Sequence, residues 1–258
     1  MFVEGNTDRE LILSLLEKRL GYKRYDNIQD MPQLLRIHVS KYPSDDGSIE
    51  NKSKPAFLHR KDIGIMVVIT NGKTNMATEI KSRLMALDYL IESEEDHLSI
   101  AVIRDRDTEK DNQKIKSEMQ EMMSKEGITL KDDSIVFKEG EYAYKMYILP
   151  DSQEGAVEKI ILDISLEKYP GLTGEAASYR KIIEDKEEFV QYGKAKELSQ
   201  EVQHFYGDKV QVGAITAVLK PDSSPAFMVR DKLITKDDVG KISQKPEVRK
   251  LLDFLDSL

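Results

Sequence analysis

The chain has 258 residues, no cysteine and a formal net charge of −8. This length fits one large domain or a domain with an appendage, and the lack of cysteine excludes disulfides and thiolate metal sites. The negative charge argues against a protein that coats nucleic acid by itself, but it allows an enzyme that acts on phosphodiesters through bound metal ions. No apolar run reaches the roughly 20 residues of a membrane span. The start Met1–Glu4 is unlike an export signal, so we expect a cytoplasmic protein with no membrane association.

The beginning of the chain predicts a short strand followed by a helix. Phe2-Val3 is apolar and is followed by Glu4-Gly5. Thr7–Glu10 has the spacing of a capping box. Apolar residues then keep a helical period up to Gly21, which is a plausible end of the helix.

The next part of the chain predicts one strongly apolar strand. Residues 22–60 are irregular, with turn chemistry at 42–48 that suits a hairpin tip or a loop. Residues 63–69 are continuously apolar, as in a strand that is buried on both faces. Asn71-Gly72 follows its end.

Residues 73–150 continue the alternation of helices and strands. This order predicts an α/β fold with a mostly parallel sheet and helices on both faces. The expected elements are a helix over 76–91, a strand over 98–104, a helix from Thr108 to Gly127, and strands over 135–137 and 144–149.

The chain becomes helix-rich after Pro150-Asp151. We therefore expect a sheet domain over 1–150 and a helix-rich C-terminal region over 151–258 packed on it. The expected features are a helix over 154–166, helical sequence over 174–206 with a break near Tyr192-Gly193, a short apolar stretch over 215–219, and a helix over 246–258.

Acidic residues follow the buried strand over 98–104. Asp105 and Asp107 point the same way if the backbone stays extended, and Glu109 comes two residues later. Neighbouring carboxylates repel unless a cation lies between them, and a divalent cation is the usual one. Because carboxyl ends of parallel strands share an edge of the sheet, Glu4 and Gly72 are expected beside these acids.

This pattern resembles the TOPRIM fold of topoisomerases, bacterial primases and OLD-type nucleases. That family has Glu-Gly after its first strand, Gly after its second, and Asp-x-Asp after its third. The matching residues here are Glu4-Gly5, Gly72, Asp105 and Asp107, with Glu109 as a further acid.

Other residues make the chain most similar to the OLD-type nucleases and their small stand-alone relatives. Asp8 matches the acid that those proteins carry four residues after the Glu, and Leu149–Asp151, Glu154-Gly155 and Lys194–Lys196 resemble their usual C-terminal run. The chain lacks the ATPase domain and phosphate-binding glycine loop of OLD-type proteins, so we expect no ATP-coupled activity.

The resemblance implies a metal-dependent site. Asp105 and Asp107 would hold one Mg²⁺ or Mn²⁺ with Glu4 near it, and Glu4 and Asp8 could hold a second; Glu109 is a further candidate ligand. Glu4, Asp105 and Asp107 are the implied catalytic residues, and Glu4 alternatively acts as a general acid or base. No tyrosine has a recognisable setting for a nucleophile, which argues against a topoisomerase.

Simpler interpretations compete at several positions. Asp8 and Glu109 also suit the first turn of a helix, where the helix dipole favours an acid, and Asp-x-Asp also suits a solvated loop. We expect the remaining charged candidates to be exposed to solvent. The lysines among them could instead face a phosphate backbone. These candidates are Glu154, Glu158, Lys194, Lys196 and Lys220.

Two functions remain open from the sequence. The first is a Mg²⁺-dependent, nuclease-like enzyme that acts on nucleic-acid phosphodiesters. The second is a TOPRIM module without turnover that binds metal or phosphate and serves a protein complex in DNA repair or defence.

Overall fold

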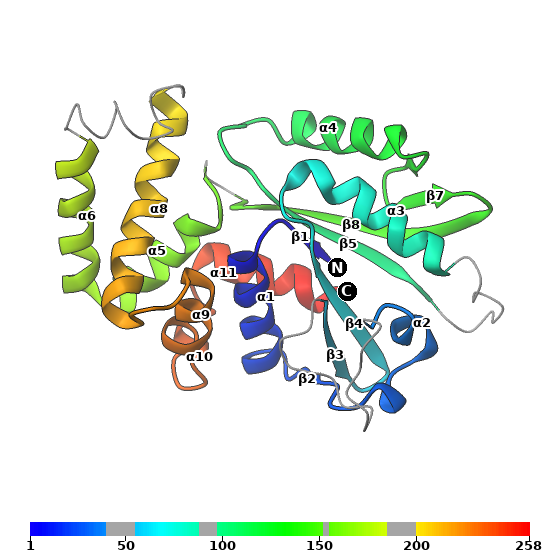
Figure 1. The fold of residues 1–258 in the computed structure, drawn as a ribbon, viewed down its shortest axis with the longest axis horizontal. Helices are drawn as coiled ribbons and strands as arrows, with labels where there is room; N and C mark the ends of the chain where they lie inside the picture. The colour runs from blue at the N-terminus through cyan, green and yellow to red at the C-terminus, as the bar shows by residue number, and fades with distance from the viewer. Residues whose placement is uncertain (40–54, 88–96, 152–154, 185–199) are drawn as a thin grey trace.

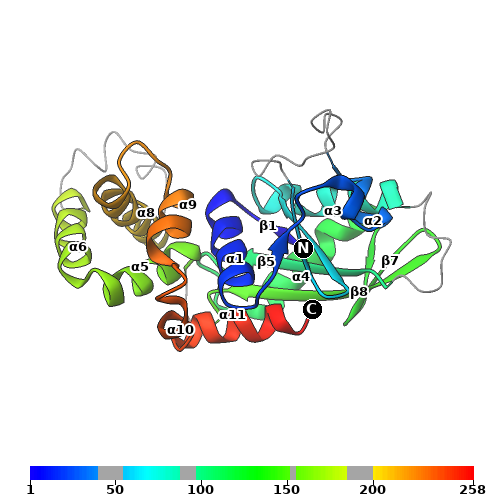
Figure 2. The ribbon, with the colours of Figure 1, turned by 90° about the horizontal axis from the view of Figure 1, so that it is seen from below.

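A computed structural model describes residues 1–39, 55–87, 97–151, 155–184 and 200–258. These residues form an eight-stranded sheet with helices on both faces (Figures 1 and 2). The strand order is β2-β3-β4-β1-β5-β8-β7-β6. The strands are β1 (Phe2–Val3), β2 (Lys23–Arg24), β3 (Ala56–Arg60), β4 (Ile63–Ile69), β5 (Ser99–Asp105), β6 (Thr129–Leu130), β7 (Ser134–Phe137) and β8 (Gly140–Leu149). The predicted turn at 42–48 lies outside the described residues.

The centre of the sheet is parallel and its margins are antiparallel. Strands β4, β1, β5 and β8 are parallel neighbours, and Phe2 of β1 lies opposite both Val68 and Val102. The pairs β2–β3, β3–β4, β7–β8 and β6–β7 are antiparallel. The sheet is therefore mixed, and the expectation of a mostly parallel sheet was wrong outside these four strands.

Two tight hairpins account for two of these antiparallel pairs, β3–β4 and β7–β8. Arg60 pairs with Ile63, and Phe137 pairs with Gly140, so a two-residue turn closes each hairpin. The first turn residues, Lys61 and Lys138, have φ angles of 53° and 51°. Glycine or asparagine usually occupies such a left-handed position. Because lysine carries no comparable signal, the sequence did not predict these turns or strand β3.

One face of the sheet is covered by two helices. Phe2, Val68 and Val102 point into a hydrophobic core on this face. Helices α3 (Met76–Leu87) and α4 (Asn112–Lys125) complete that core with Ile80, Leu84, Met119 and Met123. The methionines of α4 thus serve to pack this core.

The other face is covered by α1 (Asn6–Lys18) and by the C-terminal helices. Val3, Ile69 and Ile103 point to this side, as expected from the alternation of side chains along a strand. The C-terminal elements are α5 (Val157–Lys168), α6 (Pro170–Glu184), α8 (Gln200–Leu219), α9 (Pro225–Met228), η4 (Val229–Leu233), α10 (Val239–Ile242) and α11 (Pro246–Asp256). The remaining short elements are η1 (Ile28–Asp30), α2 (Gln33–Arg36) and η2 (Lys73–Asn75).

The C-terminal helices share the hydrophobic core of the sheet. The rings of Tyr147 in β8 and Phe254 in α11 lie 5.2 Å apart, and Arg60 Nη1 contacts Asp256 Oδ1 at 2.9 Å. Figure 1 shows α6 and α8 on the side of α5 away from the sheet. No helix in the described parts of the chain combines the length and the apolar character needed to cross a bilayer.

The predicted C-terminal elements differ from the observed ones in detail. Within the helical sequence predicted over 174–206, residues 174–184 belong to α6 and residues 200–206 to α8. The apolar stretch over 215–219 is the end of α8 rather than a separate element. The expected break near Tyr192-Gly193 lies outside the described residues.

Candidate carboxylate site at the carboxyl edge of the sheet

Three parallel strands bring their predicted residues together at one edge. Glu4 follows β1, Gly72 follows β4, and Asp105 ends β5, and these strands are neighbours. The backbone N–H of Gly72 donates to Glu4 O at 3.1 Å. The N–H of Asp105 donates to Glu4 Oε1, also at 3.1 Å. The prediction that these residues meet is confirmed.

Asp8 joins this edge from the first turn of α1. The helix begins at Asn6 with an extended Gly5 as its N-cap, and Gly5 N donates to Asp8 Oδ2 at 3.0 Å. The predicted capping box at Thr7–Glu10 was therefore wrong, because the helix starts earlier. This start places Asp8 on the inner side of the helix, where the residue is only 5% exposed.

Asp105 and Asp107 have different surroundings. Asp105 Oδ1 accepts a hydrogen bond from Val157 N at the start of α5, at 3.2 Å. Asp107 has φ of 54°, so the backbone does not stay extended and the expected common direction of the two side chains does not hold. Asp107 Oδ2 contacts Lys73 Nζ at 2.7 Å, and its carbonyl accepts from Gly155 N at 2.8 Å.

Glu109 lies beside the start of α4. Its side chain forms an ion pair with Lys114 and accepts a hydrogen bond from Asp111 N at 3.0 Å. Hydrogen bonding to Lys114 lowers the pKa of Glu109. Asp111, rather than the predicted Thr108, caps α4 by accepting from Gln113 N at 2.8 Å. The contacts of Glu109 are thus with this loop rather than with the carboxylates of the sheet edge.

Glu158 is a site residue that the sequence did not predict. We expected a solvated helix face, but Glu158, the second residue of α5, is only partly exposed. Burial raises its pKa, and the nearby charges of Asp208 and Asp107 add to this rise against the opposing charge of Lys209. Its own charge adds to the raised pKa values of Asp8 and Asp105. A usable signal was present: Gly155 and Glu158 follow strand β8 much as Gly5 and Asp8 follow β1.

The four inner carboxylates, Glu4, Asp8, Asp105 and Glu158, share one electrostatic environment. Burial, followed by the charge of Glu4, raises the pKa of Asp8 to about 7. Burial and the charges of Asp8 and Glu4 raise the pKa of Asp105 well above its usual range. Burial and the charge of Asp107 raise the pKa of Glu4, while the hydrogen bond from Asp105 N and the charges of Arg104 and Lys73 oppose that rise. The amino ends of α1 and α5 partly offset the repulsion, because helix N-termini favour negative charge.

The whole chain, residues 1–258, matches the model of a family described as "Protein of unknown function (DUF3226)". The chain belongs to this family. Among solved structures it is similar to hypothetical protein PH0156 from Pyrococcus horikoshii OT3, with 18% sequence identity and a TM-score of 0.48 over 98% of this chain and 96% of that one. No curated protein is similar enough in sequence to be matched. The chemistry of this DUF3226 chain therefore has to be inferred from its residues.

The inner carboxylates suit a hard divalent cation by their chemistry. The candidate ligand atoms of these residues are carboxylate oxygens, which Mg²⁺ and Mn²⁺ prefer. Burial and then repulsion between the carboxylates raise the pKa values of Asp8 and Asp105, and a bound cation would relieve that repulsion. In the parts of the chain that the structure describes, no three Asp, Glu, His or Cys side chains already form a metal-binding group. Each of Glu4, Asp8 and Asp105 uses one carboxylate oxygen in a hydrogen bond to a backbone N–H. The chemistry of these oxygens suits a cation, and binding one requires the side chains to turn toward a common point.

Arg106 holds the loop that carries Asp105 and Asp107. The residue is 6% exposed. Its guanidinium donates to the carbonyls of Pro150 and Asp151 at 3.0 and 2.8 Å, and of Glu109 and Lys110 at 3.3 and 3.2 Å. These hydrogen bonds join the end of β5 to the end of β8.

Replacing Arg106 by methionine is expected to lower the free energy of unfolding by about 3 kcal/mol, because the buried carbonyl of Pro150 and three partly buried carbonyls lose a charged donor. Urea denaturation of Arg106→Met measures this change. Arg249→Met is the matched control, since Arg249 is an exposed arginine on α11. Equal, small changes in the two variants would show that the loop does not depend on Arg106.

Proposed function

We propose that this chain is a TOPRIM-like, divalent-cation-dependent enzyme that cleaves nucleic-acid phosphodiesters. The observation that carries the proposal is the group of Glu4, Asp8, Asp105 and Glu158. These carboxylates come from the end of β1, from α1, from the end of β5 and from α5. Burial raises the pKa of each of them, and the charges of neighbouring carboxylates add to the rise. Such strain is common where a site is built for a charged ligand.

Asp105 and Asp8 would hold Mg²⁺ or Mn²⁺, with Glu4, Asp107 and Glu158 around them. The cation would supply a Lewis acid for the phosphodiester and an activated water. Glu4 keeps a raised pKa beside Asp107 and so suits the transfer of a proton. Lys73 Nζ lies 2.7 Å from Asp107 Oδ2 at the exposed margin of the site. There the ammonium group could contact a phosphate oxygen.

Basic residues on the C-terminal helices support a polyanionic substrate. The charge of Lys209 in α8 acts on Glu158. Lys159 and Arg180 both contact the buried Asp208, with Lys159 Nζ 3.2 Å from Asp208 Oδ2. Lys209 thus places positive charge beside Glu158, whereas Lys159 and Arg180 are already paired with Asp208. Lys220 pairs with Asp231 instead, and Lys194 and Lys196 lie outside the described residues.

A module without turnover is the second candidate. Lys73 already neutralises Asp107, and the described carboxylates do not yet converge on one point. In this case the site would bind a cation or a phosphate group and present it to a protein partner. The expected difference is cation binding with no cleavage of any nucleic acid.

A cleavage assay separates the two candidates. The purified protein is incubated with single- and double-stranded DNA and RNA in Mg²⁺ or Mn²⁺, beside Asp105→Asn and Glu4→Gln. We expect cation-dependent cleavage that both substitutions reduce by a factor of about 100 or more. Asp132→Asn, which changes an exposed acid at the turn before β7, is the matched control. Cation binding without cleavage of any substrate would reject the enzyme and support the module.

A further inference from the structure

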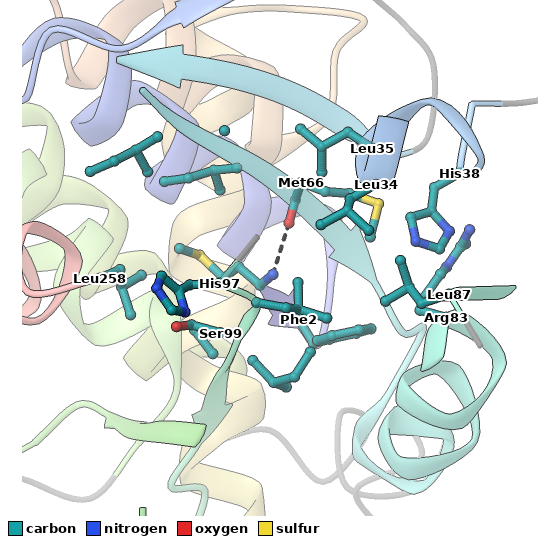
Figure 3. A pocket seen from close by; sticks show the side chains of 17 residues that line it. Phe2, Leu34, Leu35, His38, Met66, Arg83, Leu87, His97, Ser99 and Leu258 are labelled. Carbon is teal, nitrogen blue, oxygen red and sulfur yellow. Dashed lines mark hydrogen bonds between the residues drawn. The ribbon is translucent and has the colours of Figure 1, made fainter. Parts of the chain in front are cut away.

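A cavity of about 150 Å³ lies at the amino ends of β1, β4 and β5, at the opposite edge of the sheet from the carboxylates. Its walls are largely apolar, and Figure 3 shows Phe2 and Leu34 in its middle with Leu87 beside Arg83. An apolar cavity of this size holds a molecule as large as benzene. The cavity is therefore too small for a nucleotide.

Cationic and imidazole groups interrupt these apolar walls. Figure 3 shows His38 and Arg83 side by side at one end of the cavity, and His97 with Ser99 at the other. Arg83 Nε is buried and has no hydrogen-bond partner among the described residues. The ion pair of Arg83 with Glu79 is long, with 3.6 Å between Nη2 and Oε2. A buried N–H without an acceptor is costly, so this guanidinium is suited to donate a hydrogen bond to an oxygen of a bound molecule.

The pKa of His38 is lowered by burial and by positive charge at this end of the cavity. The residue is only 5% exposed. Burial, then the positive charge of Arg83 and that of the amino terminus, lowers the pKa of His38 to about 4. At neutral pH the imidazole is therefore uncharged and can serve as a hydrogen-bond donor, while Arg83 supplies the positive charge. An anion in the cavity would reduce this positive potential.

We propose that this cavity binds a small carboxylic acid with an apolar body about the size of one ring. Its carboxylate accepts hydrogen bonds from Arg83, with His38 alongside, and its body lies against Phe2 and Leu87. A guanidinium matches a carboxylate because its N–H groups form a planar fork. The inference is independent of the proposed cleavage function, since none of its residues belongs to the carboxylate site.

Benzoate is the probe for this proposal, and benzyl alcohol is its neutral counterpart of similar size. Binding is followed by calorimetry and by the imidazole signals of the protein, assigned with His38→Asn and His97→Asn. We expect benzoate to bind and to shift the signals of both histidines at pH 7. We expect benzyl alcohol to bind at least about tenfold more weakly than benzoate, because it lacks the negative charge.

Variants on α3 decide which group recognises the anion. Arg83→Gln should weaken benzoate binding at least about tenfold, and Arg83→Lys, which keeps the charge without the fork, should give an intermediate affinity. Lys81→Gln removes a positive charge from the same helix, where Lys81 pairs with Glu126 at 3.0 Å, and should bind benzoate like the unmodified protein. The proposal is overturned if benzoate does not bind, if it binds equally well to Arg83→Gln, or if it leaves the signals of His38 and His97 unchanged.

Discussion

Replacing Asp8 by asparagine is expected to stabilise the cation-free protein at pH 8. The pKa of Asp8 is about 7 in the folded protein, against a usual value of 3.8. A carboxylate whose pKa is raised by folding keeps its proton better in the folded state, so its ionisation favours unfolding. This cost is absent below pH 3.8, grows as the pH rises toward 7, and is fully present above it. Asparagine has the same shape and removes the charge.

The size of this effect follows from the shift in pKa. A shift of one unit corresponds to about 1.4 kcal/mol, so the gain for Asp8→Asn could reach about 4 kcal/mol at pH 8 and should vanish below pH 4. Urea denaturation at several pH values in the presence of a chelator measures it. Asp132→Asn, at an exposed position, should change the free energy of unfolding little at any pH. A destabilised Asp8→Asn at pH 8 would contradict the cost of ionising Asp8 that burial and the charge of Glu4 impose.

Adding Mg²⁺ or Mn²⁺ is expected to stabilise the protein strongly at pH 8 and weakly at pH 5. A ligand that binds only the folded state adds about 2.7 kcal/mol at a concentration of 100 times its Kd. At pH 5, below the pKa of about 7 of Asp8, this carboxyl group is largely protonated, and a cation must displace the proton. The raised pKa of Asp105 acts in the same direction. The melting temperature with and without cation measures the effect.

Calorimetry gives a second measurement of the same prediction. Because the pKa of Asp8 is about 7, cation binding at pH 7 should release on the order of half a proton from this residue alone. The release is found by titrating the protein in buffers with different heats of ionisation. Asp105→Asn should lose both the stabilisation and the proton release, whereas Asp132→Asn should keep them. Equal stabilisation of Asp105→Asn would place the cation elsewhere.

The predictable part of the site was the meeting of Glu4, Gly72 and Asp105. Each follows an apolar strand, and strands that run parallel in one sheet must end at the same edge. The apolar runs at 63–69 and 98–104 identified two of those strands without ambiguity, and both occupy the sheet close to their predicted bounds. Local sequence was sufficient here because burial on both faces of a strand requires continuous hydrophobicity.

The unpredicted part depended on contacts between segments far apart in sequence. Asp107 adopts a left-handed conformation in a loop that pairs with Gly155, and this bends its side chain away from the direction of Asp105. Lys61 and Lys138 close hairpins in positions that usually select glycine or asparagine. Hydrophobic periodicity does not predict these turns. The pairing of the flanking strands offsets the strain of each turn, and that pairing forms only in the folded chain.

The sequence by itself determined an α/β protein with three strand ends that carry Glu4, Gly72 and Asp105, since hydrophobic period and strand direction are local properties. Only the tertiary structure decided that Asp8 and Glu158 turn inward to join Asp105, and that Glu109 turns to Lys114 instead. The physical reason is that an acid in the first turn of a helix looks the same in sequence whether that turn faces water or a sheet. The packing of α1 and α5 on the sheet makes the choice, and with it the repulsion that suits the edge to a cation.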